Sequence, residues 1–167
     1  MKIAYVNPGV YDYLAATLIE GLTALGHEVV LSQAAAQGTH LPDEQFRAAA
    51  ETADLVVVGS NAGVRSHLVQ DVANPRKVFV DGGDSQDFAV TNNIRFKAVF
   101  KRELHRCFRE AADQRIFPLP FAAEQRYLSN EVFAKDLHVS FIANMGTNPW
   151  RHSIHQRLQN LHLPGVV

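Results

Sequence analysis

Three aspartates surround a pair of glycines at the point where an apolar run ends, in the stretch "VFVDGGDSQDF". The polar positions and the glycines between them are Asp81, Gly82, Gly83, Asp84 and Asp87. Carboxylates this close together are suited to binding a cation, moving a proton or accepting hydrogen bonds from a substrate. Calcium loops of the EF-hand type need ligands at alternating positions and a terminal glutamate, and this stretch lacks both. We therefore predict no metal site here.

Two interpretations of these aspartates remain open. In the structural one, Asp81 ends a strand and accepts hydrogen bonds from the turn that follows, while Asp84 caps a turn or short helix. In the functional one, Asp84 and Asp81 line a crevice and are the candidates for a catalytic base. Gly82 and Gly83 would then let the main chain approach a ligand closely. Asp87 is expected to be solvated only.

Apolar runs and helical repeats alternate along the chain and must position these residues. Strands are predicted at 2–6, 27–32, 53–60, 76–81, 97–101 and 136–144. Helices are predicted at 11–25, 42–52, 62–72, 104–112 and 149–161. The first helix has leucines at helical spacing, and Gly26 follows it where a left-handed residue ends a helix at least cost. Buried strands alternating with helices predict an α/β fold, a Rossmann-like doubly wound parallel sheet with helices on both faces.

Ligands of such sheets bind outside the carboxyl ends of the strands. The loops "NPGVY", "GSNAG", "DGGDS" and "NMGTNP" follow predicted strands and are therefore the candidate site. The predicted substrate-binding residues are Pro8, Gly9, Ser60, Asn61, Gly82 and Gly83. The sequence has no G-x-x-x-x-G-K-[ST], no G-x-G-x-x-G after its first strand and no G-x-S-x-G. These absences argue against a P-loop nucleotidase, a standard dinucleotide-binding domain and an α/β-hydrolase.

Composition narrows the class of protein further. The single cysteine, Cys107, excludes an internal disulfide and predicts a reducing, cytoplasmic location. No apolar run approaches the ~20 residues of a membrane span. Residues 1–90 carry 5 basic and 11 acidic residues, and residues 91–167 carry 11 and 6. This asymmetry suits either an anionic ligand near the second half or attraction between the halves. A pI of about 6.7 argues against nucleic acid as a partner.

Longer stretches of the sequence resemble a known family. "LIEGLTALGHEVVLS" is similar to the first helix and second strand of GT-B-type glycosyltransferases. The segments "VFVDGGDSQDF", "FKREL", "IFPLPFAAEQRYL" and "KDLHVSFIANMGTNPWRHSIHQRL" resemble bacterial glycosyltransferases related to spore-maturation proteins. In that group a "PLPF" segment precedes a K-D-x-x-V-S-F strand, a polar loop and an arginine-bearing helix. The resemblance covers most of the chain.

The resemblance implies two Rossmann-like domains, the first holding mainly the acceptor and the second mainly a nucleotide-sugar donor. Residues 1–130 would form the acceptor-side domain. Residues 131–167 would form a linker and the first strand–helix unit of an incomplete second domain, or would pack onto the first. The implied donor-phosphate ligands are Gly146, Thr147, Asn148 and Arg151. GT-B enzymes need no bound metal to hold the donor. The resemblance therefore implies no bound cofactor for this chain, and the nucleotide sugar would be a substrate.

The expected function is therefore part of a glycosyltransferase that transfers a sugar to a carbohydrate or other acceptor. One strand–helix unit cannot bury its own apolar face, so we expect this chain alone not to transfer sugar. The alternative is a non-catalytic flavodoxin-like module that binds a small ligand or a protein partner. Assembly into a homo-oligomer is compatible with both.

Overall fold

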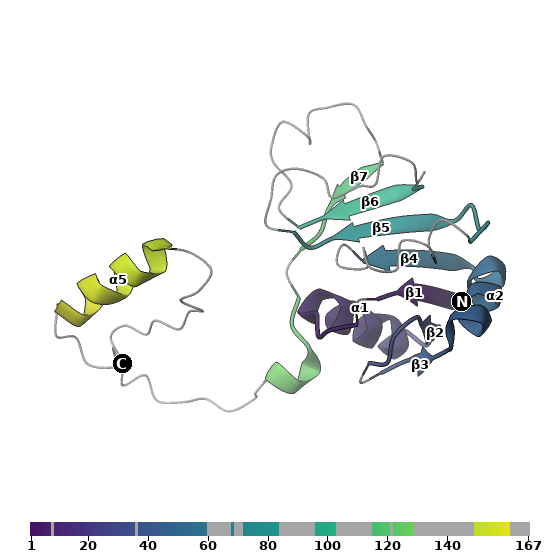
Figure 1. The fold of residues 1–167 in the computed structure, drawn as a ribbon, viewed down its shortest axis with the longest axis horizontal. Helices are drawn as coiled ribbons and strands as arrows, with labels where there is room; N and C mark the ends of the chain where they lie inside the picture. Colours follow the sequence, from purple (N-terminus) through teal and green to yellow (C-terminus); the bar gives the residue numbers. More distant parts are fainter. Residues whose placement is uncertain are drawn as a thin grey trace. The chain divides into compact units, whose positions relative to one another are not determined.

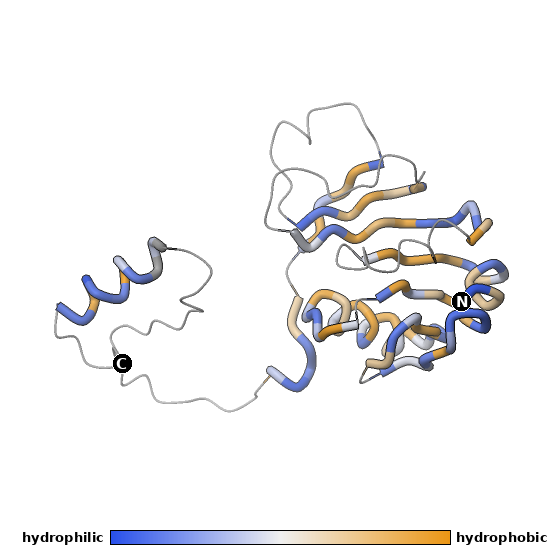
Figure 2. Tube along the Cα trace, in the orientation of Figure 1, coloured by the Kyte–Doolittle hydropathy of each residue, from blue (hydrophilic) through white to orange (hydrophobic). Residues whose placement is uncertain are grey.

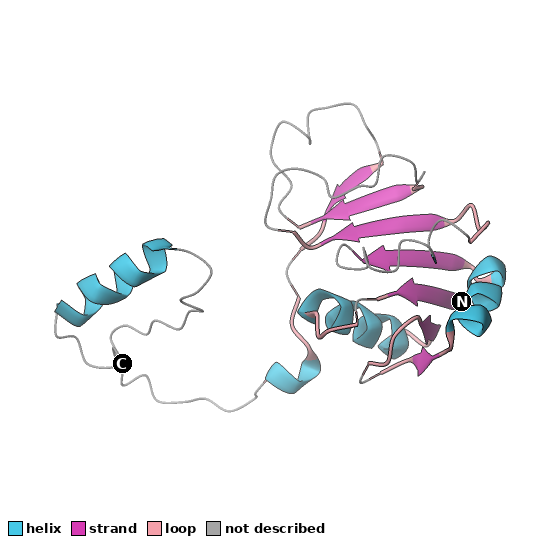
Figure 3. Cartoon of the chain, in the orientation of Figure 1, coloured by secondary structure: helices cyan, strands magenta, loops and turns pink. Residues whose placement is uncertain are grey.

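The computed structural model divides the chain into two compact units, Met1–Leu128 and Ser129–Val167. The described residues are 1–7, 9–35, 37–59, 68, 72–83, 96–102, 115–120, 122–128 and 149–160 (Figure 3). In the second unit they form helix α5 (Pro149–Asn160), where a terminal helix is predicted. The predicted strand at 136–144 lies outside the described residues, as do most of the predicted helix at 62–72 and all of that at 104–112.

The first unit is built on a sheet of seven parallel strands in the order β3-β2-β1-β4-β5-β6-β7 (Figure 1). The strands are β1 (Lys2–Val6), β2 (Glu28–Leu31), β3 (Thr39–His40), β4 (Leu55–Gly59), β5 (Lys77–Asp81), β6 (Ala98–Lys101) and β7 (Ile116–Pro118). The other elements are α1 (Tyr13–Ala24), α2 (Asp43–Thr52) and the 3-10 turn η2 (Gln125–Tyr127). The predicted α/β, Rossmann-like fold is confirmed.

The order of the strands fixes where a ligand is expected. Strands β3 to β6 follow the Rossmann order, in which the direction of winding reverses between β1 and β4. Strand β3 has only two residues, and without it the remaining strands follow the flavodoxin order. Both orders put the switch point beside the carboxyl end of β1. The topology alone therefore does not separate a transferase domain from a flavodoxin-like module.

Alternate residues of the strands pack on opposite faces of the sheet. Ile3 and Tyr5 pack in one buried cluster with Ile19 of α1. Ala4 belongs to a second cluster with Phe46 of α2. The central strands are mostly apolar along their whole length, as Figure 2 shows in orange, because both of their faces are covered. Helices on both faces are what the continuous apolar runs predict.

Helix α1 has a defined signal at each end. Asp12 caps its first turn, and the Oδ1 atom accepts the main-chain N–H of Leu14 at 2.9 Å and of Ala15 at 3.0 Å. Gly26 follows the last turn with φ of 77°, which confirms the predicted glycine terminus. The cap satisfies two main-chain donors and so fixes the loop between β1 and α1.

Two glycines should respond in opposite directions to the same substitution. Gly38 has φ of +83°, and an added Cβ would lie 3.0 Å from the Leu31 side chain, so Gly38→Ala should cost about 2 kcal/mol of unfolding free energy. Gly21 lies inside α1 with no atom within 4 Å of the added Cβ, so Gly21→Ala should stabilise by about 0.5–1 kcal/mol. Urea denaturation measures both changes. A neutral Gly38→Ala would contradict the left-handed turn before β3.

Candidate functional site

A cavity of about 270 Å³ lies beside the carboxyl ends of β1 and β2. Its walls come from the loop after β1, the part of α1 between Ala15 and Glu20, the segment after β2 and two residues that follow β7. The lining residues are Asn7, Gly9, Val10, Tyr11, Asp12, Ala15, Ala16, Ile19, Glu20, Ala34, Ala35, Gln37, Glu124 and Arg126. The cavity therefore lies on the β1–β2 side of the switch point, where ligands of such sheets bind.

Asn7 joins the two strands that end at the cavity. Its side chain is 3% exposed, and its Oδ1 accepts the N–H of Gln33 at 2.9 Å. Its Nδ2 donates to the Gln33 carbonyl at 3.1 Å, and its own N–H donates to the Ser32 hydroxyl at 3.1 Å. After the ends of β1 and β2, the side-chain amide of Asn7 thus makes the hydrogen bonds to Gln33 that a neighbouring main chain would make within the sheet. This bridge holds the wall of the cavity in place.

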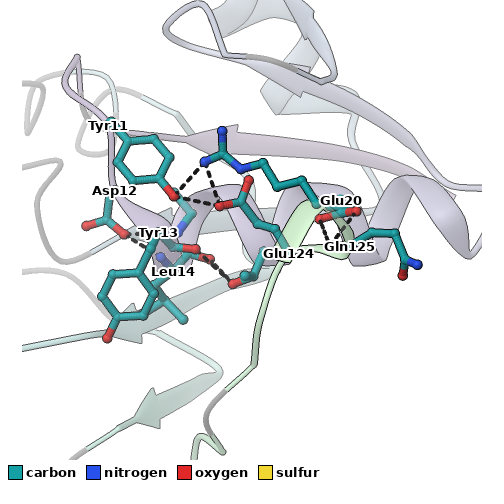
Figure 4. Close-up of polar contacts among 10 residues, drawn as sticks. Tyr11, Asp12, Tyr13, Leu14, Glu20, Glu124 and Gln125 are labelled. Atoms are coloured by element: carbon teal, nitrogen blue, oxygen red, sulfur yellow. Dashed lines mark hydrogen bonds and ion pairs between the residues drawn. The ribbon is translucent and has the colours of Figure 1, made fainter. Parts of the chain in front are cut away.

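The opposite wall is a return segment, residues 122–128, which follows β7 and contacts α1. The Tyr11 hydroxyl donates to Oε1 of Glu124 at 2.5 Å across 113 positions of sequence (Figure 4). The main-chain N–H of Gln125 lies 3.1 and 3.2 Å from the two carboxylate oxygens of Glu20. These contacts attach the segment to the loop before α1 through Tyr11 and to α1 itself through Glu20.

Arg126 completes the polar wall. Its Nη2 donates to Oε1 of Glu124 at 2.9 Å and to the Tyr11 hydroxyl at 3.0 Å. The guanidinium lies between two rings, 5.4 Å from the centroid of Tyr11 and 4.8 Å from that of Tyr127. The charge of Arg126 is thus compensated by Glu124. Within the described part of the chain, Oε2 of Glu124 accepts no hydrogen bond.

The contact between Tyr11 and Glu124 fixes the protonation state of both groups at neutral pH. The hydrogen bond to Glu124 is the main reason that the pKa of Tyr11 is raised to about 12. The pKa of Glu124 is lowered mainly by the hydrogen bond from the Tyr11 hydroxyl; burial opposes this effect, and Arg126 adds to it. Tyr11 is therefore a neutral donor and Glu124 an ionised acceptor.

Titration of Tyr11 tests this geometry. Because its pKa is raised in the folded state, the Tyr11–Glu124 bond contributes stability below the ordinary pKa of about 10 and loses it as pH rises towards about 12. The pKa of Glu124 is lowered, so its contribution is present above about 4.3 and is lost as pH falls below that value. The difference in tyrosinate absorbance between wild type and Tyr11→Phe should titrate near 12. Glu124→Gln should return it towards 10, and an unchanged value would contradict the bond.

The predicted site residues are only partly brought together. Gly9 lines the cavity, whereas Asp81, Gly82 and Gly83 lie at the end of β5 and are not among its lining residues. Arg151 lies in the first turn of α5, and its side chain is not described. The remaining predicted residues lie outside the described part of the chain: Pro8, Ser60, Asn61, Asp84, Gly146, Thr147 and Asn148.

Asp81 forms a buried ion pair. Its Oδ2 lies 3.1 Å from Nζ of Lys101, and both side chains are 1% exposed. Its Oδ1 accepts the N–H of Gly83 at 2.9 Å, and the same lysine donates to the Gly83 carbonyl at 3.0 Å. The hydrogen bond from Gly83 is the contact expected if Asp81 ends a strand and accepts hydrogen bonds from the turn that follows. A base at Asp81 stays a prediction, because a base must reach the acceptor hydroxyl.

Gly82 has a packing reason of its own. A Cβ at this position would lie 2.6 Å from Cδ2 of Leu14, which points from α1 towards the end of β5. The missing side chain therefore lets α1 and this strand end approach closely. The sequence analysis assigned Gly82 to a ligand, and the described contact is with the protein itself.

Sequence reasoning missed three residues of the polar walls of the cavity, which are Glu20, Glu124 and Arg126. Asn7 and Tyr11 belong to the loop "NPGVY", which the sequence names as part of the candidate site. The only signal is the charged run "EQRY" after the extended proline segment, which local patterning assigns to a solvated turn. Their proximity comes from tertiary contact alone.

No protein-family model, curated protein or solved structure matches this chain. Across the described ranges, no helix is long and apolar enough to cross a membrane. Within the same ranges, no three His, Cys, Asp or Glu side chains are grouped as metal ligands would be. The cavity is therefore the feature from which a function can be argued.

Proposed function

We propose that this chain is the acceptor-side part of a glycosyltransferase and that the cavity holds a carbohydrate acceptor. The observation that carries the proposal is the cavity itself, which lies at the carboxyl edge of the sheet and combines apolar walls with fixed polar groups. The family resemblance in the sequence supports the same reading. The fold is shared by many activities, so the chemistry of the cavity, and not the fold, supports this assignment.

The walls suit a sugar ring chemically. Sugars combine C–H faces with hydroxyl groups that both donate and accept hydrogen bonds. Ala15, Ile19 and the ring of Tyr11 supply apolar surface, while Asn7 and the second oxygen of Glu124 supply polar atoms. Small-molecule sites usually combine many apolar groups with a few placed polar ones.

The size of the cavity favours an acceptor over a nucleotide sugar. Pockets for drug-sized ligands measure about 300–1,000 Å³, so a cavity of about 270 Å³ suits a ligand as small as one sugar ring. Two attached phosphates and a nucleoside would need far more room. This comparison supports the acceptor role for the first unit.

The donor is proposed to bind in the second unit, through Gly146, Thr147, Asn148 and Arg151. Helix α5 begins at Pro149, so the first three of these residues directly precede a helix N-terminus. Main-chain amides at such a terminus favour phosphate, and a guanidinium adds a two-pronged contact. This part of the proposal rests on sequence position and the start of α5.

Calorimetric titration of the chain with glucose, glucosamine and UDP tests the proposed function. We expect saturable binding of at least one monosaccharide, because the cavity needs no donor to be formed. We also expect UDP to leave that binding unchanged, because the two ligands occupy different sites. Failure of every monosaccharide to bind, or competition between sugar and UDP, would contradict the acceptor assignment.

A further inference from the structure

The charged side chains of the cavity are mostly acidic. They comprise three carboxylates, those of Asp12, Glu20 and Glu124, and one guanidinium, that of Arg126. Arg126 is already paired with Glu124 and lies between two aromatic rings. A ligand that carries a phosphate or carboxylate would be repelled by such a field, and a cation would be attracted.

The Oε2 atom of Glu124 is the carboxylate oxygen with which a ligand could form a hydrogen bond. The residue is 9% exposed, and both hydrogen bonds that it accepts from described residues end on Oε1. Its lowered pKa keeps the group ionised at neutral pH. A largely buried carboxylate favours a charged or strongly donating partner, because burial otherwise penalises its charge. A cationic donor in the cavity would satisfy Oε2.

A second carboxylate is held beside the first. Glu20 is half-buried, lines the cavity and accepts the N–H of Gln125, the residue next to Glu124. That partner is a neutral main-chain group, so the negative charge of Glu20 is not cancelled by it. The unit that contains the cavity, Met1–Leu128, has a small net charge of the same sign, with 15 acidic against 13 basic residues.

We propose that the acceptor is an amino sugar, whose ammonium group binds Glu124 with Glu20 beside it. The inference rests on the proposed function and names the substrate class of the same cavity. A hydroxyl in this position would make an ordinary hydrogen bond. An ammonium makes a charge-assisted one, which is roughly twice as strong.

Glucose and two sugars that each differ from it in one substituent test the inference: glucosamine, with an amine at C2, and glucuronate, with a carboxylate at C6. Titrations of the full chain at mildly acidic pH, where the amine is protonated, should give an affinity for glucosamine about tenfold above that for glucose. Glucuronate should bind most weakly. Glu124→Gln should lower the affinity for glucosamine about tenfold and that for glucose by less, so that the preference for glucosamine over glucose is lost. Glu28→Gln, at an exposed position of β2 outside the cavity, is the matched control.

The outcomes separate this inference from the function on which it rests. Equal affinities for glucosamine and glucose, or tightest binding of glucuronate, would overturn the amino-sugar assignment and leave a sugar-binding cavity. No binding of any of the three would overturn the proposed function as well. If Glu124→Gln lowers the melting temperature strongly, Glu20→Gln is tested in its place. Glu20→Gln should lower the affinity for glucosamine about threefold and leave the affinity for glucose unchanged. An unchanged preference in a folded Glu20→Gln or Glu124→Gln protein would also overturn the inference.

Discussion

Lys101→Met should destabilise the protein by about 3–5 kcal/mol, among the largest effects of any single substitution here. The substitution leaves the carboxylate of Asp81 in a site that is 1% exposed, without the ammonium that lies 3.1 Å away in the wild type. Breaking a buried pair costs much more than the pair contributes, because the remaining charge stays desolvated without an opposite charge beside it. Urea denaturation monitored by circular dichroism measures the loss.

Two variants make the Lys101 result specific. Lys97→Met removes an exposed lysine just before the same strand and should change the unfolding free energy by no more than about 0.5 kcal/mol. The double variant Asp81→Leu with Lys101→Met should recover most of the loss, because apolar pairs often replace buried ion pairs without cost. A loss below about 1 kcal/mol for Lys101→Met alone would mean that the pair is solvated.

Ala16→Trp should lower the affinity for monosaccharides by more than about a hundredfold, because the indole group occupies the space that the ligand needs. Ala16 lines the cavity from α1 and is half-buried, so the larger side chain has no route away from the lumen except towards solvent. Calorimetric titration with glucosamine measures the change.

The matched control is Ala48→Trp, at an exposed position of α2. Ala48→Trp lowers helix propensity as much as Ala16→Trp does, but it lies outside the cavity. Its affinity for glucosamine should therefore equal that of the wild type. Thermal melting of both variants checks that they fold. If the Ala16 variant is folded and binds glucosamine normally, the cavity is not the sugar site.

The main elements of the fold could be predicted because their signals are local. The apolar runs at Lys2–Val6 and Leu55–Gly59 have no polar face, so they predict strands buried on both sides. Gly26 marks the end of α1 because its backbone angle is one that other residues rarely adopt. These patterns involve only a few neighbouring residues, so they can be recognised without knowledge of the tertiary contacts.

Other elements have no local signal. Strand β3 consists of two exposed residues, Thr39 and His40, which form a strand only because they pair with Val30 and Leu31. The return segment is polar and irregular, and its contact of Glu124 with Tyr11 joins positions 113 residues apart. Neither periodicity nor turn chemistry predicts such contacts.

Asp81 shows why a charged residue at a strand end is ambiguous in sequence. An aspartate beside two glycines fits a ligand site as well as it fits a turn. The register between β5 and β6 places Asp81 opposite Lys101, and this pairing depends on a strand 20 positions later. The residues around Asp81 do not reveal this partner, so the sequence left the structural and the functional interpretation of Asp81 both open.

Amide hydrogen exchange with and without saturating glucosamine tests most directly whether the cavity is the acceptor site. The account predicts slower exchange in residues 9–20 and 122–128 when the sugar is bound, because it contacts both walls of the cavity. Exchange in α5 (Pro149–Asn160) should stay the same. Protection confined to residues outside the two walls, or no protection at saturation, would contradict the claim.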